Sequence, residues 1–250
     1  MKAVSRYTVL TYITGDYERV HEVKEKSPHA RYILVTDRDN LKSETWDVIC
    51  DKTLFGSPVN KTRYIKWHPW KYTDDEVILM IDGSVGVNGP LDEIIAAFQG
   101  YDLCMMIHPE RNTVKSELEA WIDWRGLNPD DAEKQLSLME MTGYGLNSYR
   151  GLYQCCFKVM RRTRLVEMWM ETVAGLLMLC GKRGEFATPE QVLASFALNK
   201  FFNKIPVMWV TQCLFNSKYL TWHFHNSDDV IQRADLIEPY AFNHPVDVYI

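Results

Sequence analysis

The residues best suited to chemistry follow an apolar segment at positions 77–81, where Asp82, Gly83 and Ser84 stand in a row. An aspartate at the end of a strand ordinarily caps a turn. Here a glycine and a small hydroxyl residue come next, and they leave room for a bulky ligand to approach the backbone. A carboxylate in this position suits a divalent cation that in turn binds a phosphate. We therefore predict a ligand site at Asp82.

Polar residues also follow three other apolar segments, at Thr14, Asp37 and His108. In an open α/β sheet, ligands bind where the carboxyl ends of the strands, the loops and the helix N-termini converge. Each of these residues alone would be an ordinary turn residue, and a purely structural role stays open for Asp37. Together with Asp82 they indicate one polar edge of a sheet.

The chain has neither a G-x-G-x-x-G nor a G-x-x-x-x-G-K-[ST] pattern, which argues against a dehydrogenase and a P-loop nucleotidase. A bound nucleotide would then need a cation and basic side chains to meet its phosphate charge. Arg63 and Lys66, three residues apart on a predicted helix, are candidates. The alternative is that they form part of a solvated helix face.

Two histidines, His223 and His225, stand near the C-terminal end. In an extended segment they point to the same side, so a shared metal is geometrically feasible, although both need not be ligands. One of them together with Asp82 would suit Mn²⁺ or a similar hard cation such as Mg²⁺. Surface histidines with no ligand role are the alternative.

The elements that must position these residues alternate in type. Apolar runs rich in β-branched residues predict strands, and apolar positions at helical spacing predict helices. We expect strands at 7–13, 30–37, 46–50, 76–82, 101–108 and 152–162, and helices at 17–26, 58–72, 89–98, 163–181 and 188–200, with two more between 113 and 142. This order predicts an α/β fold, a single domain with a mainly parallel central sheet flanked by helices.

The net charge of −5 gives no global reason to bind nucleic acid. A local track formed by "RRTR" at 161–164 and by Lys158 stays open. The first residues do not resemble a signal peptide, and the longest apolar stretch, 173–181, is too short to span a bilayer. The six cysteines lack zinc-site spacing, so we expect free thiols and a cytoplasmic protein without a membrane span.

The segment "DDEVILMIDGSVGVNGPLDEII" is similar to the region around the D-x-D motif of GT-A glycosyltransferases. The chain as a whole resembles a plant glycosyltransferase-like family once known only as a domain of unknown function. The resemblance runs over residues 6–225 and rests on the following pieces: Ile81-Asp82-Gly83; His108, Arg111 and Glu117; Gly151-Leu152-Tyr153; and "PEQVLASF", with Glu190, Gln191, Ser195 and Phe196.

The resemblance implies a GT-A-like (Rossmann-like) fold, with a nucleotide-binding half at about 1–110 and an acceptor or catalytic half at about 111–250. It implies a nucleotide-sugar donor, a UDP-sugar above others, and a hydroxyl acceptor on a glycan or another molecule. With Arg63 and Lys66 from the helix, the residues expected to bind the donor are Tyr12, Thr14, Asp37, Arg63, Lys66, Asp82, Gly83, Ser84, His108 and Arg111.

In the same resemblance, Asp82, Ser84 and a histidine from 223 or 225 hold Mn²⁺ or Mg²⁺, and Glu190 and Gln191 lie on the reactive face of the sugar. The chain departs from the family pattern where Ser84 replaces the second aspartate and where the arginine before the Glu-Gln pair is absent. Trp70 also stands where a histidine is common.

The charge that develops on a leaving diphosphate calls for a cation and basic side chains. We favour a retaining transfer, in which the leaving phosphate oxygen takes the acceptor proton. An inverting transfer would need a carboxylate base, either Glu190 or Glu117. Two alternatives stay open: a phage-type transferase acting on a modified DNA base, and a non-catalytic protein that binds nucleotide sugars or glycans.

Overall fold

A seven-stranded sheet forms the centre of the molecule, in the order β3-β2-β1-β4-β7-β6-β8. The computed structural model describes residues 5–16, 18–125, 127–145, 152–180, 189–215 and 217–223. The strands of this sheet are β1 (Tyr7–Ile13), β2 (Ala30–Thr36), β3 (Asp47–Cys50), β4 (Val77–Ile81), β6 (Leu103–Ile107), β7 (Tyr153–Arg161) and β8 (Val207–Val210). A separate two-stranded sheet pairs β5 (Val85–Val87) with β9 (Leu220–Trp222).

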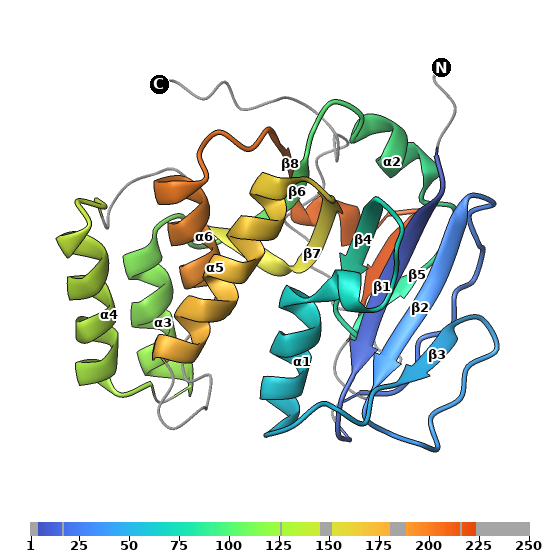
Figure 1. Ribbon diagram of the computed structural model, residues 1–250, viewed down its shortest axis with the longest axis horizontal. Helices are drawn as coiled ribbons and strands as arrows, with labels where there is room; N and C mark the ends of the chain where they lie inside the picture. The colour runs from blue at the N-terminus through green and yellow to red at the C-terminus, as the bar shows by residue number, and fades with distance from the viewer. Residues whose placement is uncertain are drawn as a thin grey trace.

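The helices of the described chain lie around this sheet (Figure 1). They are α1 (Pro58–Trp67), α2 (Asp92–Ala97), α3 (Val114–Arg125), α4 (Pro129–Met141), α5 (Arg164–Cys180) and α6 (Glu190–Phe201), with short 3₁₀ turns η1 (Pro69–Lys71) and η2 (Gln212–Phe215). No helix in the described part of the chain is long and apolar enough to cross a membrane.

The sheet is mainly parallel, and β7 is the exception, because it runs antiparallel to both of its neighbours, β4 and β6. The chain moves outward from β1 through β2 to β3 and then returns to place β4 on the other side of β1. The strand order therefore reverses between β1 and β4. In open α/β sheets, the crevice outside the carboxyl ends of the strands at such a reversal is where ligands bind.

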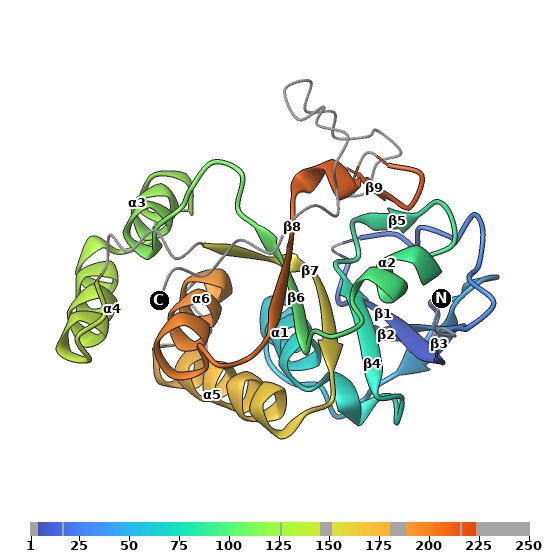
Figure 2. The same ribbon diagram turned by 90° about the horizontal axis from the view of Figure 1, so that it is seen from above.

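Both faces of the sheet are covered. Leu10 and Tyr12 of β1 face one buried cluster with α1, α5 and α6, whereas Val9 and Ile13 face a second cluster with α2 and the β5–β9 pair. Figure 2, seen from above, shows these layers on opposite sides of the sheet. Successive side chains of a strand point to opposite faces, so a strand covered on both sides is expected to be almost continuously apolar. This explains the uninterrupted apolar run of β4.

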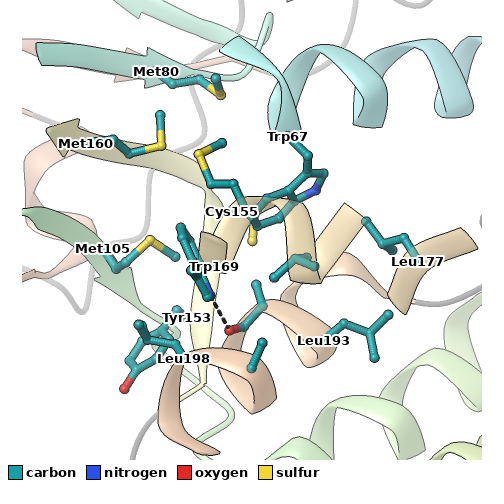
Figure 3. Packing of buried hydrophobic residues seen from close by; sticks show 14 of the residues in the cluster. Trp67, Met80, Met105, Tyr153, Cys155, Met160, Trp169, Leu177, Leu193 and Leu198 are labelled. Atoms are coloured by element: carbon teal, nitrogen blue, oxygen red, sulfur yellow. Dashed lines mark hydrogen bonds between the residues drawn. The ribbon is translucent and has the colours of Figure 1, made fainter. Parts of the chain in front are cut away.

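The first of these clusters packs α1 and α5 against the middle of the sheet (Figure 3). Trp67 at the end of α1 meets Trp169 of α5 edge to face, with ring centroids 5.3 Å apart. The indole N–H of Trp169 donates to the carbonyl of Ala194 on α6 at 3.2 Å. Because aromatic pairs and buried hydrogen bonds fix orientation as well as contact, the three helices are held in a defined arrangement over the sheet.

Local signals explain where α1 and α4 begin. The side chain of Ser57 accepts from the N–H of Asn60, and Pro58 occupies the first helical turn of α1. Asn128 and Pro129 repeat this combination at the start of α4, inside the break that the sequence predicts between two helices at 113–142. The strands predicted at 7–13, 30–37, 46–50, 76–82, 101–108 and 152–162 are all confirmed, with small shifts at their ends.

The helix predicted at 17–26 is wrong, since residues 18–26 are described and are not helical. This segment is held by tertiary contacts instead. The N–H of Lys24 donates to the carbonyl of Val87 at 3.0 Å, and the indole of Trp46 donates to the carbonyl of His21 at 3.0 Å. The carboxylate of Glu22 accepts hydrogen bonds from residues 43–45. Helix propensity is weak enough for such contacts to override it.

The two predicted halves share one sheet rather than standing apart. β7, from the second half, lies between β4 and β6, which both come from the first. The sequence did not predict β5, β8 or β9. Thr188, the first residue of the helix predicted at 188–200, lies outside the described residues, and α6 has Pro189 in the N-cap position.

Candidate functional site

Asp82 lies at the carboxyl end of β4, directly beside Tyr12 at the end of β1. Its N–H donates to the carbonyl of Cys156 at 3.0 Å, which fixes its backbone against β7. Its Oδ1 accepts a hydrogen bond from the hydroxyl of Tyr12. The next residue has to be Gly83, because a Cβ there would lie 2.7 Å from the carbonyl oxygen of Tyr12. The pair thus occupies the point where the strand order reverses.

Lys66, in the last turn of α1, joins this pair to α6. Its ammonium lies 3.1 Å from Oδ1 of Asp82 and donates to Oε1 of Glu190. Arg63, one turn earlier, places its Nε 3.9 Å from Oε2 of Glu190. Arg63 and Lys66 are both buried, at 6% and 5% exposure, so the alternative of a solvated helix face is wrong. Two cations and two carboxylates therefore meet at the switch point.

Burial and charge act in opposite directions within this group, which we call the switch-point cluster (Tyr12, Arg63, Lys66, Asp82 and Glu190). Burial acts to lower the pKa of Lys66, but Asp82 and Glu190 outweigh it and hold the pKa well above its usual value. Burial acts to raise the pKa of Glu190, but Lys66 and Arg63 outweigh it and hold the pKa below its usual value. Burial and the charge of Asp82 both raise the pKa of Tyr12.

These shifts define what the cluster can do. Glu190 is held as an anion, and a carboxylate with a lowered pKa is a weaker proton acceptor than an unperturbed one. The ammonium of Lys66 stays charged near neutral pH and can meet incoming negative charge. Asp82 has a side chain that is 30% exposed, so a ligand can reach its carboxylate.

Thr14 and Asp37 lie at the ends of β1 and β2 and contact the start of α1. The hydroxyl of Thr14 donates to the carbonyl of Pro58 at 2.7 Å, and Asp37 accepts from the N–H of Gly15 at 2.9 Å and from Lys61 at 2.7 Å. Burial would raise the pKa of Asp37, but the bonds from Lys61 and Gly15 hold it below its usual value. Both residues thus have structural partners at the predicted polar edge.

A second group gathers around the buried carboxylate of Glu117 on α3. Arg111 and Gln191 both donate to this carboxylate, and the indole of Trp121 donates to its Oε1 at 2.9 Å. His108 completes the group, since its Nε2 lies 2.7 Å from Nη2 of Arg111. The sequence analysis assigned His108 and Arg111 to the donor and gave Glu117 and Gln191 catalytic roles, and the structure brings these four residues together.

The two groups meet at the start of α6, where consecutive residues serve both. Glu190 is bound to Lys66 of the switch-point cluster, and Gln191 is bound to Glu117. Glu117 has no exposed surface and accepts from three side chains. Its geometry therefore suits an anchor that sets the position of α6. Of the two carboxylates predicted as a base, Glu190 is the one at the switch point.

Two of the predicted metal ligands, Ser84 and His223, meet through their backbones. The side chain of Ser84 is buried, and its carbonyl accepts from the N–H of His223 at 2.9 Å. The ring of His223 stacks on that of His21, with centroids 4.2 Å apart. His225 lies outside the described residues. In the part of the chain that the structure describes, no three His, Cys, Asp or Glu side chains converge as a metal-binding group.

Asp82 is the predicted ligand whose chemistry and exposure fit a cation. A carboxylate oxygen is the donor that Mn²⁺ and Mg²⁺ prefer, and the side chain is partly accessible.

The basic track left open at Lys158 and 161–164 lacks Lys158 at the surface, because this residue has no exposed area and is part of the core. Arg162 and Arg164 are exposed. Arg161 pairs with Glu76 at 2.7 Å, and Arg162 pairs with Glu167 at 2.8 Å. Two of the arginines that the DNA-binding alternative would use therefore have acidic partners.

One feature near the site has no counterpart in the sequence analysis. A cavity of about 240 Å³ is lined by Arg19, His21 and other residues between 19 and 24, by residues 86–88, and by His223. Glu18 lies close enough to Gly83 that a Cβ there would be 3.7 Å from its Cγ. A helix was predicted over this segment, so nothing local indicated that its side chains would reach the end of β4.

Lys158 was considered as a surface residue in the sequence analysis, but it is buried and contacts the carbonyl of Lys66, a member of the switch-point cluster.

All six cysteines are free, as predicted, although Cys50 is exposed. The chain matches no protein-family model and no curated protein. What the site does must therefore be argued from its own geometry.

Proposed function

We propose that the protein is a GT-A-type glycosyltransferase that moves a sugar from a nucleotide sugar, with a UDP-sugar as the expected donor, to a hydroxyl acceptor. The observation that carries the proposal is the switch-point cluster. An acidic residue that a ligand can reach stands at the carboxyl end of β4, beside two buried cations, where the strand order of an α/β sheet reverses.

The charges of these residues suggest a different role for each. Lys66 and Arg63 meet the negative charge that develops on the β-phosphate as the sugar leaves. Thr14 and Asp37, at the ends of β1 and β2, border the place of the nucleoside. The buried setting strengthens each of these interactions, because there is less water to screen them.

Asp82 would hold a divalent cation, Mn²⁺ or Mg²⁺, and that cation would supply further positive charge to the leaving diphosphate. His225 stays a predicted ligand. The hydroxyl of Tyr12 orients the Asp82 carboxylate through its hydrogen bond to Oδ1.

The state of Glu190 favours a retaining transfer. An inverting transfer needs a carboxylate that accepts a proton, whereas Glu190 is held as an anion by Lys66 and is a weakened base. In a retaining transfer, the departing phosphate oxygen takes the proton of the acceptor, and Glu190 stabilises positive charge on the sugar ring.

The test is a donor-consumption screen. The wild-type protein is incubated with a panel of nucleotide sugars with and without Mn²⁺, and nucleotide release is measured. Asp82→Ala is the test variant, and Glu119→Ala is the matched control, since Glu119 is an exposed carboxylate on α3. We expect release of nucleotide from one donor, loss of this release in Asp82→Ala, and no change in Glu119→Ala. Full activity in Asp82→Ala would refute the role given to Asp82.

Calorimetry with UDP and Mn²⁺ separates the enzyme from a non-catalytic binding protein. Heat of binding without consumption of any donor would favour the binding protein. The neutralised arginines at 161 and 162 give no support to the alternative that acts on DNA. Salt-sensitive retention of DNA by the protein would reinstate it.

A further inference from the structure

Lys158 is a lysine in the middle of the hydrophobic core. It lies on β7 opposite Met80 of β4 and Met105 of β6, and it has no exposed surface. Its Nζ is 3.8 Å from the ring centroid of Trp67 and 3.4 Å from the carbonyl oxygen of Lys66. The two residues that it contacts are the last two of α1. The apolar side chains around this position are drawn in Figure 3.

A buried ammonium is costly unless its charge is compensated. The contacts of Lys158 supply partial compensation of two kinds. The carbonyl of Lys66 is one of those that the end of a helix leaves without an intrahelical partner, and the C-terminus of a helix favours positive charge. The face of Trp67 attracts a cation. Neither contact is a carboxylate, so the ammonium is held through α1 itself.

The contact to Lys66 ties Lys158 to the site. The carbonyl of Lys66 accepts from Lys158, while the ammonium of the same residue lies between Asp82 and Glu190. Movement of the last turn of α1 would therefore displace the Lys66 side chain from both carboxylates. Nothing in the contacts of Lys158 reaches a place that a substrate could occupy.

We propose that Lys158 is a positioning residue for the proposed transfer, which in its ammonium form holds the last turn of α1 and so places Lys66 between Asp82 and Glu190. Its effect on turnover rests on the proposed function. Its effect on Lys66 does not, because that effect follows from the contacts within the protein.

The charge of this lysine changes within an accessible pH range. Burial lowers the pKa of Lys158 to about 8. The titratable groups that face it are Lys66 on α1, Asp82 after β4, Cys155 on β7 and Glu190 on α6. Below this pKa the ammonium attracts the Trp67 ring and the end of α1. Above it, the neutral amine loses the cation–π attraction and the interaction with the helix end.

The first experiment measures Lys66 directly. Protein labelled with ¹³C at the lysine ε-carbons is titrated by NMR, and Lys66→Met and Lys158→Met assign the two signals. We expect one lysine signal to titrate near pH 8 and to vanish in Lys158→Met, and the Lys66 signal to shift in that variant. Lys115→Met, an exposed lysine on α3, serves as the control. An unchanged Lys66 signal in Lys158→Met would overturn the proposal.

The second experiment measures turnover of the donor between about pH 7 and pH 9.5. We expect wild-type kcat to fall as pH rises through the pKa of Lys158, with about a tenfold loss in Lys158→Met and no such fall in Lys158→Arg, because arginine stays charged. If the arginine variant does not fold, the comparison of the wild type with Lys158→Met still decides, since only the wild type should show this fall. Equal pH profiles in those two proteins would contradict the proposal.

The two experiments keep the proposals apart. If the wild type consumes no donor at any pH, the proposed function fails, and the NMR titration still decides whether Lys158 places Lys66. If the donor is consumed but neither the Lys66 signal nor the pH profile responds to Lys158→Met, the role of Lys158 fails while the proposed function stands.

Discussion

Lys66 on α1 donates a hydrogen bond to Glu190 at the start of α6, although 124 residues separate the two along the chain. The same ammonium lies 3.1 Å from Asp82 at the end of β4. One side chain thus joins a helix from the first half of the chain, a strand end and a helix from the second half. The contact places the ammonium of Lys66 in the site and connects the elements that form it.

Replacing Lys66 with methionine removes the cation that faces both carboxylates. We expect kcat for the donor to fall by about 10²-fold or more, because a charge aimed at the leaving group is lost. We also expect a loss of about 3 kcal/mol in the free energy of unfolding, because a buried pair loses one partner. Steady-state kinetics and urea unfolding measure the two effects. Lys115→Met should change neither, and a fully active Lys66→Met would contradict the role given to Lys66.

Glu190 should make the protein sensitive to acid. Its pKa is lowered in the folded state, so its ion pair stabilises the fold above the pKa of the unfolded chain, about 4.3. This contribution is lost as pH falls through the folded-state pKa. We expect Glu190→Gln to show a smaller loss of unfolding free energy than the wild type between about pH 5 and pH 3. Urea unfolding at several pH values measures the difference, and parallel curves for both proteins would argue against it.

Lys158 should make the stability depend on pH on the alkaline side as well. Burial lowers its pKa to about 8, so between this value and the unfolded-state value of about 10.4 the unfolded chain binds more protons. Wild-type stability attributable to this group therefore rises with pH across that window. Relative to the wild type, Lys158→Met should be more stable near pH 7, by on the order of 3 kcal/mol at most, and the gap should close by about pH 10. A difference in unfolding free energy between the two proteins that does not change with pH would contradict a charged Lys158 in the folded state.

Alanine substitutions at Gly83 and Gly175 form a matched pair that tests how closely the backbone after Asp82 packs against Tyr12. A Cβ at Gly83 would lie 2.7 Å from the carbonyl oxygen of Tyr12, whereas a Cβ at Gly175 would meet nothing within 4 Å. Gly83→Ala should lower the free energy of unfolding by about 1–3 kcal/mol and reduce donor turnover. Gly175→Ala, within α5, should raise it by about 0.5–1 kcal/mol. Thermal unfolding compares them, and equal effects would show that the backbone at Gly83 has room to adjust.

Glu117 and Gln191 test whether the second group anchors α6. If Glu117 acts through Gln191, then Glu117→Gln and Gln191→Leu should lower kcat to a similar degree, and the double variant should lose little more than either one. If Glu117 were the catalytic base, Glu117→Gln alone would abolish turnover, and Gln191→Leu would have a smaller effect. A double-mutant cycle on kcat/KM decides between the two, and strictly additive losses would contradict the anchor.

The sequence by itself determined the element types wherever local signals agreed. The apolar run of β4 and the aspartate after it identified a buried strand with a polar end, because strands covered on both faces are typically almost continuously apolar. Asn128 and Pro129 located the start of α4, because capping chemistry is local to a few residues. Arg63, Lys66 and Asp82 were predicted as site residues from their chemical types, and Glu190 was predicted from the family resemblance.

Only the tertiary structure decided how these residues meet. Three features have no local pattern in the sequence that would predict them. These are the antiparallel insertion of β7 between β4 and β6, the placement of Lys158 against the end of α1, and the non-helical course of residues 18–26. Each depends on contacts between segments far apart in the chain. From the sequence, Lys158 would be expected at the surface, because lysines are almost never fully buried. Only the packing of Trp67 and the end of α1 around it makes it part of the core.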